Sequence, residues 1–271
     1  MSHRNAWANP SRLGAEAAER MAAFLEQRSQ LADQIELNRA LLSAVDLQPG
    51  ERVLEAGCGS GALARMAAGS LAAEIQLVAM DISPHLLDYA RRVDAQNKVA
   101  YLAGDVQRLP VASGSFDAAI AARLLLHVTD PLPVVCELAR AVRPGGRMAL
   151  MDWDFETLAV DHPDRELTRR LLHWRNDHHG GNNWSGRQLL RLAFQANLQE
   201  PKVIPVTSVA RDEHANLTHS LLRAAEVARD GGAISSQEYD RWVGLLRERL
   251  QEGTFFASMD YFIVIATRGA G

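Results

Sequence analysis

The stretch of sequence that decides the fold is Val53-Leu-Glu-Ala-Gly-Cys-Gly-Ser-Gly61. Two apolar residues lead into a turn in which glycine recurs at every second position, and a helical pattern begins near Gly61. Glycine adopts backbone conformations that are closed to other residues and lets a ligand approach the main chain. A turn between a buried strand and a helix favours negative charge or close backbone contact. Ala62 stands where the dinucleotide fingerprint Gly-x-Gly-x-x-Gly has its last glycine, so the turn departs from that fingerprint.

Strands and helices alternate around this turn, which predicts a mostly parallel sheet covered on both faces. The expected strands are residues 52–55, 76–80, 100–103, 116–121 and 147–151, with helices beginning near Gly61, Pro84 and Pro131. The segment Val142-Arg-Pro-Gly-Gly146 is predicted to be the turn before the fifth strand. After Trp153 we expect helices over 162–177, from 185, over 215–228 and over 236–251, and strands over 203–209 and 262–266.

The domain organisation follows from the segments that flank this alternation. Residues 12–46 show apolar steps of three and four residues, so we expect an N-terminal helical cap over 1–46. Residues 47–271 would form the second domain, with helical insertions near 160–200 and 212–252. A plain doubly wound sheet joins its last two strands by a short hairpin, so we expect the second insertion to lie over the ligand edge. Its apolar periodicity indicates packing only.

Composition excludes several classes of function. The chain has 271 residues, of which 47% are hydrophobic and 23% charged, which is ordinary for a globular protein. A formal net charge of −4 gives no broad attraction to nucleic acid, so no nucleic-acid partner is expected. No apolar run is long enough to be a signal peptide or to cross a membrane. With only Cys58 and Cys136, we expect a soluble protein of the reducing cytoplasm, and a homodimer is the assembly we consider.

Two further strand ends carry polar groups. Asp81 ends the second strand, where a carboxylate accepts hydrogen bonds from both hydroxyls of a ribose. Gly104-Asp105-Val106 ends the third strand, where a carboxylate accepts from the amino group of adenine. The alternative is that Asp81 and Asp105 only cap the following helices.

Taken together, these motifs resemble class I S-adenosylmethionine-dependent methyltransferases. The resemblance rests on 53–61, on Val78-Ala-Met-Asp-Ile-Ser-Pro84, on 104–106, on Phe116-Asp117 and on 142–146, in that order, and it covers residues 50–155. It implies an α/β fold, a Rossmann-like seven-stranded doubly wound sheet with an antiparallel last strand, N-terminal helices and inserted lid helices. It also implies S-adenosylmethionine as the cofactor. The expected cofactor residues are Glu55, Ala56, Gly57, Cys58, Gly59, Gly61, Asp81, Ile82, Gly104, Asp105, Val106 and Arg123.

The acceptor is expected beyond the ends of the fourth and fifth strands, because ligands of open α/β sheets bind outside the carboxyl ends. His127 is the candidate general base, although a structural histidine packed against the helix from Pro131 is an equal alternative. The fifth strand runs into Asp152-Trp153-Asp154. We expect Asp154 to be the carboxylate that faces the acceptor and Trp153 to contact it.

The segment from Leu172 to Trp184 concentrates aromatic rings, imidazoles and amides next to two glycines. Trp174, His178 and Trp184 are therefore candidate substrate-binding residues of a lid. A metal site is a weaker alternative, because His173, His178 and His179 lack the i, i+4 spacing of paired ligands. We expect no bound metal, and an exposed structural loop stays open as a third interpretation.

The predicted function is methyl transfer from S-adenosylmethionine to an O, N or C atom of a small molecule, mainly through proximity and orientation. Methylases of exocyclic amines carry an Asn/Asp-Pro-Pro-aromatic motif after the fourth strand, where this chain has Arg123-Leu-Leu-Leu126. An alternative is a cofactor-binding protein of the same fold that has lost methyl transfer. A nicotinamide dehydrogenase is disfavoured by Ala62 and by the lack of a Tyr-x-x-x-Lys pair.

Overall fold

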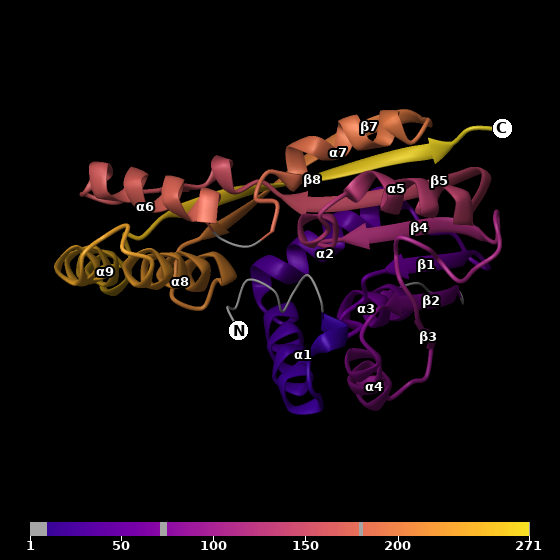
Figure 1. Cartoon of the computed structure of the whole chain (residues 1–271), viewed down its shortest axis with the longest axis horizontal. Helices are drawn as coiled ribbons and strands as arrows, with labels where there is room; N and C mark the ends of the chain where they lie inside the picture. The colour runs from indigo at the N-terminus through magenta and orange to yellow at the C-terminus, as the bar shows by residue number, and fades with distance from the viewer. Residues whose placement is uncertain (1–9, 71–74, 179–180, 271) are drawn as a thin grey trace.

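The computed structural model describes residues 10–70, 75–178 and 181–270, and a twisted sheet forms its centre (Figure 1). In this part of the chain the sheet has eight strands, in the order β3-β2-β1-β4-β5-β8-β6, with β7 paired to β8. The strands are β1 (Arg52–Ala56), β2 (Gln76–Asp81), β3 (Val99–Ala103), β4 (Phe116–Ala122), β5 (Val142–Trp153), β6 (Ala159–Val160), β7 (Leu198–Ala210) and β8 (Ala257–Arg268). The first five are parallel, and β8 runs antiparallel to both β5 and β7.

The expected fold class is therefore confirmed. Seven strands have the predicted arrangement with an antiparallel last strand, and the two-residue β6 is an addition that pairs with the start of β8. The residues 142–146, expected as a turn, belong to an irregular start of β5, where Phe116 pairs with Val142 and Ala118 already pairs with Arg147. The expected helix over 12–46 is two helices, α1 (Ala15–Ser29) and α2 (Ala32–Val45), separated at Gln30 and Leu31.

Alternating side chains of the strands build two cores, as a sheet buried on both faces requires. One core contains Val53 and Ala118 and packs against α2 and α3 (Ala62–Ser70). The other contains Leu54 and Ala119 and packs against α5 (Pro131–Ala141) and α7 (Ser185–Gln195). Helix α4 (Pro84–Val93) follows β2, begins with proline, and has Ser83 as its N-cap.

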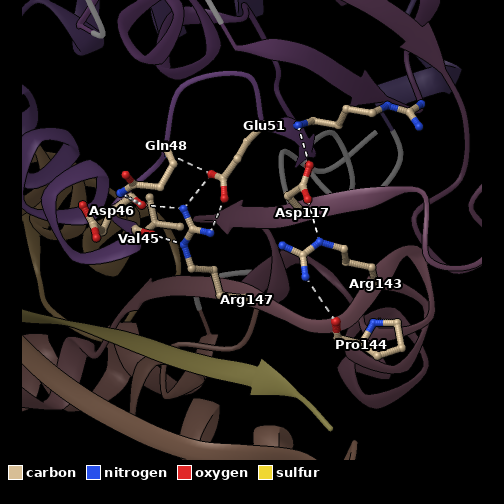
Figure 2. A network of polar contacts seen from close by, with 9 residues as sticks. Val45, Asp46, Gln48, Glu51, Asp117, Arg143, Pro144 and Arg147 are labelled. Carbon is tan, nitrogen blue, oxygen red and sulfur yellow. Dashed lines mark hydrogen bonds and ion pairs between the residues drawn. The ribbon is translucent and has the colours of Figure 1, made fainter. Parts of the chain in front are cut away.

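A polar network fixes α2 to the amino edge of the sheet (Figure 2). Arg147 at the start of the regular part of β5 forms two 2.7 Å bonds to the Glu51 carboxylate. It also donates to the carbonyl oxygens of Val45 and Asp46, which end α2. Nearby, Asp117 accepts from Arg143 at 2.6 Å and from the Arg52 backbone at 2.8 Å. These contacts hold α2 across the sheet, so its polar residues reach the opposite, carboxyl edge in a fixed position.

A helical lobe lies beyond the carboxyl edge of the sheet (Figure 1). It contains α6 (Arg165–His178), α8 (Asn216–Asp230) and α9 (Ser236–Gln251), which contact one another. Trp242 is fully buried between them, where it stacks on His162 and donates to Thr168 at 2.9 Å. Two single-turn helices, η3 (Leu125–His127) and η4 (Phe155–Thr157), follow β4 and β5. Helix η3 contacts β5 and α7, whereas η4 contacts β8 and helix α6 of the lobe. A further short turn, η2 (Pro10–Arg12), precedes α1.

Candidate functional site

The glycine turn connects β1 to α3 at the carboxyl edge of the sheet. Gly57, Gly59 and Gly61 have φ angles of +72°, +55° and +75°, in the left-handed region that favours glycine. The backbone N–H groups of Gly57 and Cys58 donate to the Met80 carbonyl at 2.8 and 2.9 Å, which ties the ends of β1 and β2 together. A Cβ on Gly57 would lie 2.6 Å from Leu124, so a side chain there would clash as well as strain the turn.

Asp81 is part of the same hydrogen-bonded unit. Its carboxylate accepts from the backbone N–H of Gly59 and from that of Ser83, both at 2.9 Å. Burial raises the pKa of Asp81, and these two bonds act against that rise. Asp81 is not the cap of α4, because Ser83 has that role. Each carboxylate oxygen keeps a free acceptor position, so Asp81 is able to bind a ligand and hold the turn at the same time.

The neighbouring strand ends present the other residues expected at a nucleoside. Ile82 is 40% exposed, which is unusual for its size and leaves an apolar surface beside Asp81. Asp105 is exposed and accepts from the Gln107 backbone at 2.9 Å. Gly104 donates to the Asp81 carbonyl at 3.0 Å, and a Cβ on Gly104 would lie 2.7 Å from the sulfur of Met80. The structure therefore brings the predicted residues of three strand ends to one edge.

Glu55 ends β1 beneath the glycine turn and is 4% exposed. Burial raises its pKa to about 8, although the charge of Arg123 acts in the opposite direction. Its Oε2 atom has no hydrogen-bond partner within the described ranges. Arg123 follows β4, has a φ of +55°, and donates to the Asn38 side chain of α2 at 3.0 Å. One Arg123 nitrogen, Nη1, also lacks a partner in this part of the chain.

Helix α1 covers the glycine turn from outside the sheet. Leu25 would lie 2.9 Å from a Cβ on Gly59. Glu26 pairs with Arg65 of α3 at 2.6 Å, and Glu19 pairs with Arg92 of α4 at 2.6 Å. The first nine residues of the predicted N-terminal cap lie outside the described residues.

The two acids at the end of β5 have different surroundings. Asp152 is 1% exposed and accepts from the Ser185 hydroxyl at 2.7 Å and from the Leu126 backbone at 3.1 Å. Burial raises its pKa to about 7, and its Oδ1 has no partner among the residues described. Asp154 instead caps η4 and is bound through both oxygens by Arg187 of α7. Asp154 therefore faces α7, contrary to the expectation that it faces the acceptor.

The predicted aromatic residues separate into two groups. The Trp153 ring lies 6.2 Å from that of Tyr261 on β8 and 5.0 Å from that of Phe155, and its Nε1 has no partner in the described segments. Trp174 stacks on His178 at 4.5 Å and packs against Gly231 at the end of α8. Trp184 lies at the start of α7 and is 36% exposed. Of the three tryptophans, Trp153 is the one with a buried, unpartnered nitrogen among the described residues.

His127 ends η3, the turn whose residue Leu126 binds the Asp152 carboxylate. Its side chain is half-buried. Leu126 also accepts from the Asn182 backbone at 2.7 Å, which places the loop before α7 against η3. His179, considered above as a metal ligand, lies outside the described residues, and no group of three His, Cys, Asp or Glu suited to a metal occurs within them.

Sequence reasoning missed three residues of this region: Tyr261, Arg28 and Arg175. Tyr261 is 1% exposed and pairs with Trp153 in the sheet register. Arg28 on α1 and Arg175 on α6 both interact with it electrostatically. Arg175 follows Leu167 and Leu171 at four-residue steps on α6, so its place on the buried stripe was the available signal.

Comparison with known proteins agrees with this geometry. Residues 54–150 match the methyltransferase domain family. An uncharacterised 37.1 kDa protein of a Streptomyces fradiae transposon is 35% identical over 228 residues, which are 83% of this chain and 65% of that protein. The methyltransferase GfsG of Streptomyces halstedii is 33% identical over 156 residues, 55% of this chain and 50% of its own length. The chain thus spans between half and two thirds of these relatives.

A solved structure supports the fold alone. Phosphoethanolamine N-methyltransferase 2 of Haemonchus contortus, in complex with S-adenosyl-L-methionine, has a TM-score of 0.61 and 17% identity, and the match covers 99% of this chain and 60% of that one. No helix among the described residues is long and apolar enough to span a membrane. By the family match, its strand order and its glycine turn, the part of the chain over residues 54–150 is a methyltransferase domain of the class I S-adenosylmethionine-dependent type.

Proposed function

We propose that the protein transfers the methyl group of S-adenosylmethionine to an O, N or C atom of a small molecule. The observation that carries the proposal is Glu55, a buried acid with an unpartnered oxygen under a left-handed glycine turn. A buried acceptor of this kind calls for a ligand that donates to it, and the ammonium group of the cofactor is such a donor. Asp81 would hold the ribose, while Ile82 and Asp105 would contact the adenine.

When bound, S-adenosylmethionine supplies a methyl group on a positively charged sulfonium. The residues of this chain then have to orient a nucleophile and exclude water. Arg123 and Asp152 end β4 and β5 at the crevice, and both side chains are anchored, to Asn38 and to Ser185. Leu124 lies against the glycine turn, and Trp153 and Tyr261 form an apolar wall beyond it. A rigid, largely buried surface of this type supports catalysis by alignment.

We propose His127 as the general base and a positioning role for Asp154. For an O or N acceptor, His127→Asn is expected to lower kcat about 100-fold with little change in KM, because the base acts only as the proton leaves. The dependence of its rate on pH between 5 and 8 should change rather than disappear, because burial also raises the pKa values of Asp152 and Glu55 to about 7 and about 8. Steady-state kinetics across this range measure both effects.

Asp154→Asn is the comparison variant for this prediction. It weakens the Arg187 contact without touching the acceptor, so its pH profile should keep the shape of the wild type. An unchanged kcat and pH profile in His127→Asn would contradict the general-base role and leave alignment as the mechanism.

The methyltransferase proposal itself is tested in two steps. Calorimetry with S-adenosylmethionine is expected to show one site per chain, whereas NADH should not bind. Incubation with methyl-labelled cofactor and a panel of small alcohols, phenols, amines and carboxylic acids should label a product. Cofactor binding without transfer to any compound would favour the alternative, a binding protein that has lost methyl transfer. Absence of cofactor binding would exclude both.

The wider organisation of the protein is part of the same proposal. We retain a helical cap over 1–46 and a catalytic domain over 47–271 with two helical insertions. A cytoplasmic location and a homodimer are also part of this proposal. Size-exclusion chromatography with light scattering checks the homodimer.

A further inference from the structure

Three arginines converge on Tyr261 at the acceptor side of the crevice. Arg28 comes from α1, Arg123 from the end of β4 and Arg175 from α6. Arg28 and Arg123 lower the pKa of Tyr261, and Arg175 lies 3.3 Å from the ring centroid of Phe155, which packs on the same Trp153 ring as Tyr261 does. We name Arg28, Arg123, Arg175 and Tyr261 the arginine cluster. Arg28 and Arg123 are like charges that act on each other, and Arg175 is a buried charge, so both arrangements cost free energy unless something compensates for them.

Arg175 is the member with the fewest compensating contacts. It is 4% exposed, and its guanidinium carbon lies 3.3 Å from the centroid of the Phe155 ring. No carboxylate pairs with it among the described residues, and its Nη1 atom has no hydrogen-bond partner there. Burial lowers the pKa of Arg175 to about 9, so the side chain stays charged at neutral pH. The cation–π contact offsets part of the desolvation cost and leaves the N–H groups available.

The acids near the cluster do not balance it. Asp33 interacts with Arg28 and Arg123, but it also accepts from the side chains of Gln34 and Ser208. Within the cluster, Glu55 and Asp152 interact with Arg123, and Glu55 also interacts with Arg65 of α3. No acid acts on Arg175 in the same way, so its charge lacks a counter-ion among the described residues.

The unpartnered atoms define the chemistry of the missing group. Trp153 Nε1 and Arg175 Nη1 are donors whose side chains both contact Phe155. Arg123 Nη1 is a third donor, and the unpartnered acceptors Glu55 Oε2 and Asp152 Oδ1 belong to side chains that interact with Arg123 and not with Arg175. A set of donors with surplus positive charge matches an acceptor-only group, and carboxylates and phosphates are the common groups of that type. A neutral hydroxyl or amine would leave the charge uncompensated.

We propose that the arginine cluster binds an anionic group, a carboxylate or a phosphate, carried by the methyl acceptor. The inference rests on the proposed methyltransferase function, because it concerns the charge of the molecule that accepts the methyl group. The amino-acid end of S-adenosylmethionine has one negative and one positive charge, so it balances a contact between Arg123 and Glu55 and leaves Arg175 unmatched. The anion therefore belongs to the second substrate.

The test measures binding of simple anions to the full chain. With S-adenosylhomocysteine present in saturating amount, we expect calorimetry to detect benzoate or inorganic phosphate but not benzamide, the neutral isostere of benzoate. Sodium chloride keeps the ionic strength constant. Arg175→Met should weaken anion binding about 10- to 100-fold, the loss of one charged hydrogen bond from a buried site. The preferred anion distinguishes an acidic acceptor from a phosphorylated one.

Arg169→Met is the matched control, since Arg169 is exposed on the same helix α6 and has no ion pair among the described residues. It should bind anions as the wild type does. Should Arg175→Met fail to fold, Arg28→Met gives the same readout. Equal binding of benzoate and benzamide by the wild type, or no loss in a folded Arg175 variant, would overturn the inference. Loss of cofactor binding with anion binding intact would instead count against the proposed function.

Discussion

Replacing Asp81 with alanine is expected to weaken binding of S-adenosylmethionine by about 100- to 1,000-fold. The carboxylate would bind the ribose through two charge-assisted hydrogen bonds, each worth about 1.5–3 kcal/mol. The change also removes the acceptor of the Gly59 and Ser83 backbone N–H groups, so the glycine turn loses its support. Calorimetric titration with the cofactor measures the loss.

Two further variants separate these contributions. Asp81→Asn keeps one acceptor oxygen and should bind the cofactor with intermediate affinity. Asp88→Ala is the control, because Asp88 is exposed on α4 and pairs only with Arg91, so its affinity should equal that of the wild type. Melting temperatures report whether each variant is folded. Full affinity in a folded Asp81→Ala protein would show that the cofactor does not bind at this strand end.

The cofactor half of the site could be predicted, because the residues that form its turn are adjacent in the sequence and their types determine the backbone conformation. Three glycines at alternate positions require backbone angles that the structure shows at Gly57, Gly59 and Gly61. Asp81 and Asp105 follow buried strands directly, and parallel strands bring their ends to one edge. The limits of the first four strands were correct within one residue, since apolar runs and the following polar residues mark them, whereas the predicted starts of β5, β7 and β8 were each five residues late.

The acceptor half depends on partners far apart in the chain. Asp152 and Asp154 have different surroundings because helix α7 supplies Ser185 to Asp152 and Arg187 to Asp154. Each partner lies 33 residues away in the sequence. Spacing could not separate them: the strand ends at Trp153, and the backbone turns before Asp154. Tyr261 was missed because β8 begins at Ala257, five residues before the predicted strand.

Arginines on helices are usually assigned to the solvent face, and this assumption hid the arginine cluster. The sequence periodicity of α6 does indicate that Arg175 is buried, because Leu167, Leu171 and Arg175 lie on one buried stripe. A charged residue at a core position of an otherwise amphipathic helix is expensive to bury. Such a position is therefore a better indicator of a ligand than Trp174, His178 and Trp184 in the same stretch of sequence.

Glu55→Gln is expected to make the cofactor-free protein more stable at high pH while it weakens cofactor binding. The pKa of Glu55 is about 8 in the folded protein and about 4.5 in an exposed chain, so the folded state holds the proton more tightly. The unfolding free energy of the wild type therefore falls as pH rises from about 5 to 9, because the buried carboxyl must ionise. Glutamine mimics the protonated acid, so the variant should exceed the wild type by about 4–5 kcal/mol at pH 9 and by less than about 1 kcal/mol at pH 5. Urea unfolding at the two pH values measures this difference.

The proton on the Glu55 carboxyl also provides a test of cofactor binding. The cofactor is a cation, and its ammonium group beside Glu55 would return the pKa of that acid toward its ordinary range. Binding at pH 7 should then release close to one proton per chain in the wild type and almost none in Glu55→Gln, as calorimetry in buffers of different ionisation enthalpy would show. Affinity for the cofactor should fall about tenfold in the variant, because an amide accepts from an ammonium more weakly than a carboxylate does. Equal proton release in the two proteins would mean that Glu55 does not face the cofactor, and its raised pKa would then reflect burial alone.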